Sequence, residues 1–126
     1  DFMKSRRPVN HNPFKYKFPI TALVSIGHRI SGILIFIAIP FALSALSSIK
    51  GSPESFAALS LMISGLGGLL VLAFLGALFY HLLAGIRHLV MDFGYGETKQ
   101  VAKITAWILI LLELVLLITV GVFLWA

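Results

Sequence analysis

Two histidines near the end of a long apolar segment are the residues of this chain that most clearly suggest chemistry. His81 and His88 enclose the stretch Leu-Leu-Ala-Gly-Ile-Arg, and four residues later comes Asp92, which a continued helix would pair with His88. At helical spacing His81, Gly85 and His88 share one face. Ionisable side chains are costly inside a membrane, so an intramembrane histidine is expected to have a function.

The residue types around His81 suit a haem. Imidazole ligates haem iron, and the porphyrin is a flat, largely apolar group. Gly85 leaves a hollow one turn from His81 where such a group can lie, and Arg87 and His88, nearer the water, suit its anionic propionates. The alternative is that Gly85 serves close helix packing and His81 hydrogen-bonds to a neighbouring helix. Spacing does not choose between the two interpretations.

A second polar cluster lies near the start of the first apolar segment. Ser25, Arg29 and Gly32 fall on one helical stripe, and His28 is beside Arg29. A hydroxyl paired with a guanidinium suits a carbonyl oxygen, for example that of a quinone, while His28 and Arg29 are within reach of an acidic group such as a propionate. Alternatively, Arg29 snorkels to the interface, because it lies only about two turns from the expected helix start.

The composition indicates that these residues lie on membrane helices. The chain has 126 residues, of which 59% are hydrophobic and 12% charged, and this is typical of a membrane protein. It has no cysteine, which excludes disulfides, thiolate zinc sites and cysteine-ligated iron–sulfur clusters. Any metal must therefore be held by histidine or carboxylate, or arrive within a cofactor.

The hydropathy pattern predicts a single all-α domain over residues 1–126. A basic, proline-containing segment at 1–18 precedes three transmembrane helices at about 19–46, 56–90 and 102–125, since each span needs about 20 apolar residues. Glu113 interrupts the third span. We expect it to be either protonated and hydrogen-bonded or facing a partner subunit.

The positive charges predict the orientation of the chain in the membrane. Five lysines and arginines precede the first span, and Arg87, Lys99 and Lys103 flank the second connector, whereas the first connector has only Lys50. The N-terminus and the second connector are therefore expected on the cytoplasmic or matrix side. This places both polar clusters in one layer near the same membrane face.

Four blocks of the sequence stand out by their order and separation. The blocks are Arg7-Pro-Val-Asn10, Phe18-Pro-Ile-Thr-Ala22, Ser25-Ile-Gly-His-Arg-Ile-Ser-Gly32 and His81-Leu-Leu-Ala-Gly-Ile-Arg-His-Leu-Val-Met-Asp-Phe-Gly-Tyr95. Together they resemble the cytochrome b subunit of succinate dehydrogenase, one of the two membrane anchors of complex II. The resemblance covers nearly the whole chain, and Gly27 departs from it by being small where bulkier apolar residues are familiar.

This resemblance implies half of a heterodimeric helical bundle, in which a second three-helix anchor binds a b-type haem together with this chain. It makes His81 one axial ligand of the haem iron, with the other ligand on the partner; an intrachain pair of His28 and His81 is the less favoured alternative. It further implies that Ser25 and Arg29 line a ubiquinone site, and that His28, Arg29 and His88 are neighbours of the haem propionates.

The resemblance implies no succinate-oxidising site on this chain, because that reaction belongs to docked flavoprotein and iron–sulfur subunits. The chain would be a subunit of succinate:quinone oxidoreductase that passes electrons to ubiquinone in the bacterial inner membrane, with the mitochondrial inner membrane as the less favoured alternative. Alternatives are the anchor of a quinol:fumarate reductase and a cofactor-free structural anchor. A small transporter subunit is disfavoured, since no inverted repeat is evident.

Overall fold

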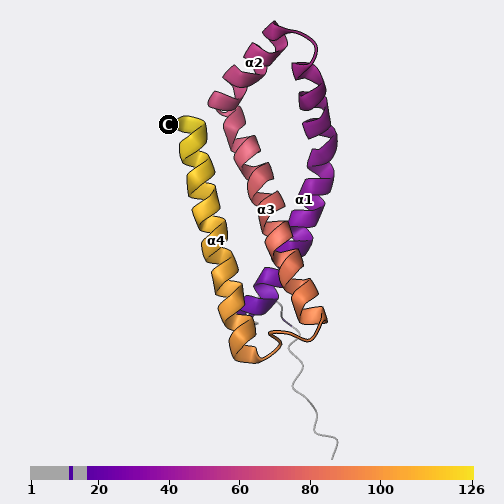
Figure 1. Ribbon diagram of the computed structural model, residues 1–126, viewed down its shortest axis with the longest axis vertical. Coiled ribbons are helices and arrows are strands. Elements are labelled where there is room, and N and C mark those ends of the chain that lie inside the picture. Colours follow the sequence, from indigo (N-terminus) through magenta and orange to yellow (C-terminus); the bar gives the residue numbers. More distant parts are fainter. Residues whose placement is uncertain (1–11, 13–16) are drawn as a thin grey trace, which may run out of the picture.

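The structure is a computed structural model that describes residue 12 and residues 17–126, and within these residues the regular structure is entirely helical. The chain forms α1 (Ile20–Ile49), α2 (Pro53–Ser64), α3 (Gly67–Asp92) and α4 (Lys99–Trp125). Figure 1 shows α1, α3 and α4 running side by side, with α2 closing the hairpin between α1 and α3. Of the expected basic segment at 1–18, residues 1–11 and 13–16 lie outside the described residues.

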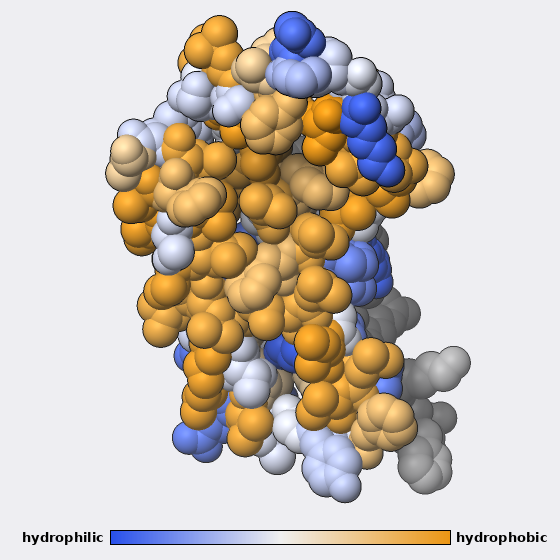
Figure 2. All heavy atoms as spheres, turned by 45° about the horizontal axis from the view of Figure 1, so that its top comes forward, coloured by the Kyte–Doolittle hydropathy of each residue, from blue (hydrophilic) through white to orange (hydrophobic). Residues whose placement is uncertain are grey.

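Three of these helices are long and apolar enough to cross a membrane. They are α1 with 30 residues, α3 with 26 and α4 with 27. At 1.5 Å per residue each exceeds the roughly 30 Å hydrocarbon core of a bilayer. Hydrophobic side chains cover most of the face visible in Figure 2, as expected for a surface in contact with lipid or with another membrane subunit. The chain is therefore an all-α membrane bundle.

The predicted second span at about 56–90 differs from the structure, which divides it into α2 and α3. The break lies at Gly65 and Leu66, and the indole Nε1 of Trp125 donates a hydrogen bond to the Gly65 carbonyl at 3.3 Å. The chain turns so tightly there that a Cβ atom built on Gly67 would lie 2.6 Å from the carbonyl oxygen of Met62. The glycines of this stretch therefore mark a turn as well as close packing.

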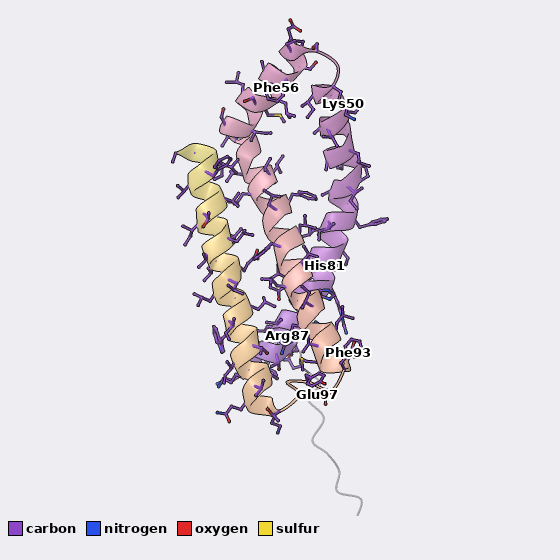
Figure 3. All side chains as sticks on the ribbon, in the orientation of Figure 1. Lys50, Phe56, His81, Arg87, Phe93 and Glu97 are labelled. Carbon is purple, nitrogen blue, oxygen red and sulfur yellow. The ribbon has the colours of Figure 1, made fainter. Side chains whose placement is uncertain are left out.

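The start of α1, the end of α3 and the start of α4 lie at the same end of the bundle. The connector between α3 and α4 reverses the chain through Gly94 and Gly96, which have φ angles of 88° and 70°. Figure 3 shows Arg87, Phe93 and Glu97 toward this end and Lys50 at the opposite end. The two polar clusters of the sequence therefore do lie in one half of the bundle.

The buried core lies in that same half. Val24 of α1, Ala84 of α3, and Ala106 and Leu109 of α4 form its central cluster. The two alanines let the backbones of α3 and α4 approach their neighbours closely, as small residues commonly do where membrane helices associate. Because Val24 precedes Ser25 and Ala84 lies one turn before His88, this packing fixes the position of the polar residues described below.

Candidate functional site

Helices α1 and α3 bring three histidines into one stack. The ring of His28, on α1, lies between two rings of α3: its centroid is 4.2 Å from that of His81 and 5.0 Å from that of His88. The interplanar angles are 11° and 25°. The residues that the sequence places in two separate clusters are thus in direct contact.

The hydrogen bonds of His81 define which of its nitrogens is free. Its Nδ1 is 3.1 Å from the His28 carbonyl oxygen and 3.2 Å from Oγ of Ser31, whose own hydroxyl donates to the same carbonyl at 2.8 Å. Both partners accept, so Nδ1 of His81 carries the proton. In the neutral ring Nε2 then has a free lone pair, which is the form that a metal requires.

A pocket of about 450 Å³ opens beside His81. One wall is close to the ring, because a Cβ atom built on Gly32 would lie 3.1 Å from Cε1 of His81. The pocket therefore combines apolar surface with one imidazole that has an available nitrogen and one guanidinium. Its lining residues are His28, Arg29, Gly32, Ile33, Phe36 and His81.

This donor set fits a haem better than a free metal ion. Within the described part of the chain, no group of three or more histidine, cysteine, aspartate or glutamate residues is arranged to hold a metal. A single imidazole nitrogen suits iron that a macrocycle already coordinates on four sides. The apolar lining suits the porphyrin, and Arg29 suits its carboxylates.

The stacking of His28 on His81 argues against these two residues as an axial pair. Their rings are parallel with centroids 4.2 Å apart, which leaves no room for a porphyrin that would have to lie between them. The position of the His28 ring also corrects the expectation of a hollow at Gly85. Nε2 of His28 lies 3.3 Å from where a Cβ of Gly85 would be, so the histidine fills that space.

Ser25 and His88 form a direct hydrogen bond between α1 and α3. Oγ of Ser25 is 2.9 Å from Nε2 of His88, and Nδ1 of His88 is 2.6 Å from the carbonyl oxygen of Ala84. His88 thus bonds to Ser25 and to its own helix rather than to Asp92, the partner that its spacing suggests. Neither Ser25 nor His88 lines the pocket beside His81.

Arg87 points away from the histidines, contrary to the expectation that it lies near the propionates. Its Nε donates to Oγ1 of Thr105 at 3.2 Å, and its NH2 group donates to the carbonyl of Ala102 at 3.1 Å. Both partners are on α4. Adjacent residues of a helix project about 100° apart, so Arg87 and His88 serve different neighbours.

Two residues of the site have no role in the sequence interpretation. Ser31 holds Nδ1 of His81, and the hydroxyl of Tyr80 donates to the Val24 carbonyl at 2.8 Å. A Cβ atom on Gly27 would lie 2.5 Å from the Tyr80 oxygen, so the small residue at 27 makes room for this ring. The sequence did show that residue 27 is smaller than the resemblance leads one to expect, but it did not identify Tyr80 as the side chain that occupies the space.

The comparisons with known proteins agree with the resemblance seen in the sequence. Residues 3–120 match the family model described as the succinate dehydrogenase/fumarate reductase transmembrane subunit. The chain is 38% identical to a succinate dehydrogenase cytochrome b556 subunit of Coxiella burnetii, over 98% of this chain and 100% of the relative. It is 36% identical to the subunit of that name from Paracoccus denitrificans, over 82% and 81% of the two chains.

A relative named for a cytochrome b560 also matches the chain. The chain is 33% identical to a succinate dehydrogenase cytochrome b560 subunit of Reclinomonas americana, over 86% of this chain and 79% of the relative. The range 3–120 that matches the family model includes both polar clusters and all the helices up to residue 120. The chain therefore belongs to the family of succinate dehydrogenase/fumarate reductase transmembrane subunits, as a cytochrome b anchor.

Proposed function

We propose that this chain binds a b-type haem together with a second three-helix anchor subunit and helps to form the ubiquinone-reduction site of succinate dehydrogenase. The observation that carries the proposal is the hydrogen bonding of His81. A haem ligand must be neutral, with one nitrogen free and the other N–H held by an acceptor. His81 meets this requirement through His28 and Ser31.

The haem supplies one-electron transfer, and the residues of this chain determine how it is held. Nε2 of His81 would be one axial ligand, and the stacked geometry of His28 favours a second ligand from the partner subunit. Two axial imidazoles leave no open position on the iron, which suits electron transfer or storage rather than oxygen chemistry. Arg29 and His28, which line the pocket, would face the propionates, with His88 stacked behind His28.

The quinone site is assigned to Ser25 and Arg29. They are one helical turn apart on α1, so a hydroxyl and a guanidinium can approach one carbonyl oxygen from the same side. Ser25 lies one residue after the buried Val24, which makes its backbone position rigid. This rigidity favours a defined hydrogen-bond geometry for the quinone head group.

The charges near the site support a cytoplasmic position for it. Arg87, Lys99 and Lys103 belong to the end of the bundle that holds the site, whereas Lys50 lies at the opposite end. By the positive-inside rule, the site end faces the cytoplasm of a bacterial inner membrane. Flavoprotein and iron–sulfur subunits docked on that side would deliver electrons from succinate.

The proposal is tested with the complex purified through this chain, by reduced-minus-oxidised optical spectra of the parent and of two variants. His81→Leu should lose or alter a low-spin b-type signal, whereas His28→Leu should retain bound low-spin haem. Loss of the signal in His28→Leu alone would make His28 the ligand. A parent complex with no haem would support a cofactor-free structural anchor instead.

The physiological direction needs a separate measurement. A quinol:fumarate reductase would use the same anchor to carry electrons toward the soluble subunits. Redox titration of the complex with its native quinone separates the two directions, because electrons flow toward the couple of higher potential. A quinone potential above that of the succinate couple supports the proposed direction, and one below it supports fumarate reduction.

A further inference from the structure

The hydrogen bond between His88 and Ser25 has a direction that the structure fixes. Nδ1 of His88 is 2.6 Å from the Ala84 carbonyl oxygen, which only accepts, so Nδ1 carries a proton in every state of the ring. In the neutral ring Nε2 is then the acceptor. The hydroxyl of Ser25, 2.9 Å away, must donate to it.

This direction matters for a quinone, because a carbonyl oxygen needs a donor. While Ser25 donates to neutral His88, it offers lone pairs to the site, and these suit the O–H group of a quinol. A proton added to His88 can only go to Nε2, because Nδ1 is already protonated. Nε2–H then donates to Ser25, and the Ser25 hydroxyl is free to donate to the quinone carbonyl.

We propose that His88 is a positioning residue for quinone reduction, which sets the hydrogen-bond direction of Ser25 and supplies one proton to the quinone through it. The inference rests on the proposed function in one respect, namely that Ser25 binds the quinone. It goes beyond that function because it gives His88 a part in the reaction rather than a place beside the haem.

The proton transfer balances as follows. Two electrons from succinate oxidation reduce the quinone. The O–H bond of Ser25 breaks as an O–H bond forms on the quinone oxygen, and the Nε2–H bond of His88 breaks as its proton passes to Oγ of Ser25. Neutral His88 is left, accepting from Ser25 once more. Water supplies the proton for the second quinone oxygen and later restores the proton on His88.

The surroundings of His88 contain few other titratable groups. From α1, His28 stacks on its ring with centroids 5.0 Å apart, and Ser25 bonds to it. Arg29 follows His28 on the same helix, and Asp92 lies one turn beyond His88 on α3. His88 is intermediate in exposure and lies four residues before the end of α3, so water from that end of the bundle can restore its proton.

The test uses the whole purified complex with Ser25→Ala, His88→Gln and the double variant. The glutamine amide oxygen can still accept a hydrogen bond from Ser25 but cannot deliver a proton. If His88 had only a structural role, His88→Gln would therefore keep the parental rate. His88→Asn is a second variant, which retains a donor near the Ala84 carbonyl and loses contact with Ser25. Dye reduction by the soluble subunits and the haem spectrum verify assembly in every case.

We expect His88→Gln and His88→Asn to lower the kcat of ubiquinone reduction about 100-fold, the lower end of what a positioned proton donor contributes. Dye reduction and haem content should remain at parental levels. The rate of the parent should also decline as the proton concentration falls, because His88 must carry a proton to donate one, and His88→Gln should abolish this dependence. The double variant should be no slower than Ser25→Ala.

Two results would overturn the inference, and they are distinguishable. If the complex with Ser25→Ala reduces ubiquinone at the parental rate, the proposed quinone site is wrong, and the proposed role of His88 is wrong as well. If Ser25→Ala is slow while His88→Gln retains the parental rate and pH profile, Ser25 binds quinone and His88 has only a structural role.

Discussion

Nδ1 of His81 lies 3.1 Å from the carbonyl oxygen of His28, and this contact between α3 and α1 determines the chemistry available to His81. It selects the tautomer of the neutral ring in which Nε2 has a free lone pair, and the ring borders the pocket that His28 and Arg29 also line. The acceptor is a backbone atom of a membrane helix. Its position therefore depends on helix packing and not on the His28 side chain.

The contact between Gly32 and His81 predicts the effect of adding one methyl group. In Gly32→Ala the new Cβ would lie 3.1 Å from Cε1 of His81, so the ring must move by a few tenths of an ångström. We expect a lower haem content or a shifted midpoint potential, measured on the purified complex by haem assay and redox titration. Alanine favours a helix over glycine by about 0.5–1 kcal/mol, so a general loss of helix stability cannot explain such a result.

Gly121→Ala is the matched control for that variant. A Cβ at position 121 meets only the ring of Trp125 at 3.7 Å, an ordinary van der Waals distance. Its haem content and potential should equal those of the parent. Parental values in Gly32→Ala as well would show that the His81 ring does not need its present position.

The pair Gly27 and Tyr80 predicts a destabilising variant and its partial rescue. In Gly27→Ala the Cβ would lie 2.5 Å from the Tyr80 oxygen, and such overpacking costs typically 1–3 kcal/mol. Tyr80→Phe alone should cost about 1 kcal/mol through loss of the bond to the Val24 carbonyl. Thermal unfolding of the complex measures both.

In the double variant the atom nearest to the new Cβ is gone, although the ring carbon that carries it would still be 2.9 Å away. The double variant should therefore be more stable than the sum of the single effects predicts. Additive losses would mean that the two residues do not oppose each other in the assembled complex.

Glu113 provides a test of what covers α4. Its Oε2 is buried and has no hydrogen-bond partner among the residues that the structure describes, and such a group typically costs about 1–3 kcal/mol. If the assembled complex leaves it unpaired too, Glu113→Leu should match or exceed the parent in thermal stability, with Glu113→Gln close to the parent. A marked loss of stability in Glu113→Leu, restored by Glu113→Gln, would instead identify a partner-subunit hydrogen bond.

The apolar spans and the grouping of polar residues were accessible from the sequence, because both follow from hydropathy and helical periodicity. The break between α2 and α3 was not. Gly65, Gly67 and Gly68 were visible, but membrane helices tolerate glycine, so composition alone cannot distinguish a turn from tight packing. The decisive facts are the approach of Gly67 to the Met62 carbonyl and the bond from Trp125 across 60 positions of sequence.

The details of the site depend on how one helix faces another, which periodicity does not report. Spacing placed Gly85 on the face of His81, but only the packing of α1 shows that His28 fills the space. The direction of Arg87 was partly accessible, since it is adjacent to His88 and cannot share its face. The Ser25–His88 bond joins residues 63 positions apart and required the structure.

Ligation by His81 is tested most directly by removing its imidazole and supplying it again from solution. The complex with His81→Gly should lose the low-spin haem signal in low-temperature electron paramagnetic resonance, and added imidazole should restore a low-spin signal by binding in the vacated space. Restoration would show that the lost group was an iron ligand and that the fold survived. A complex that retains the parental low-spin signal in His81→Gly without imidazole would contradict the account.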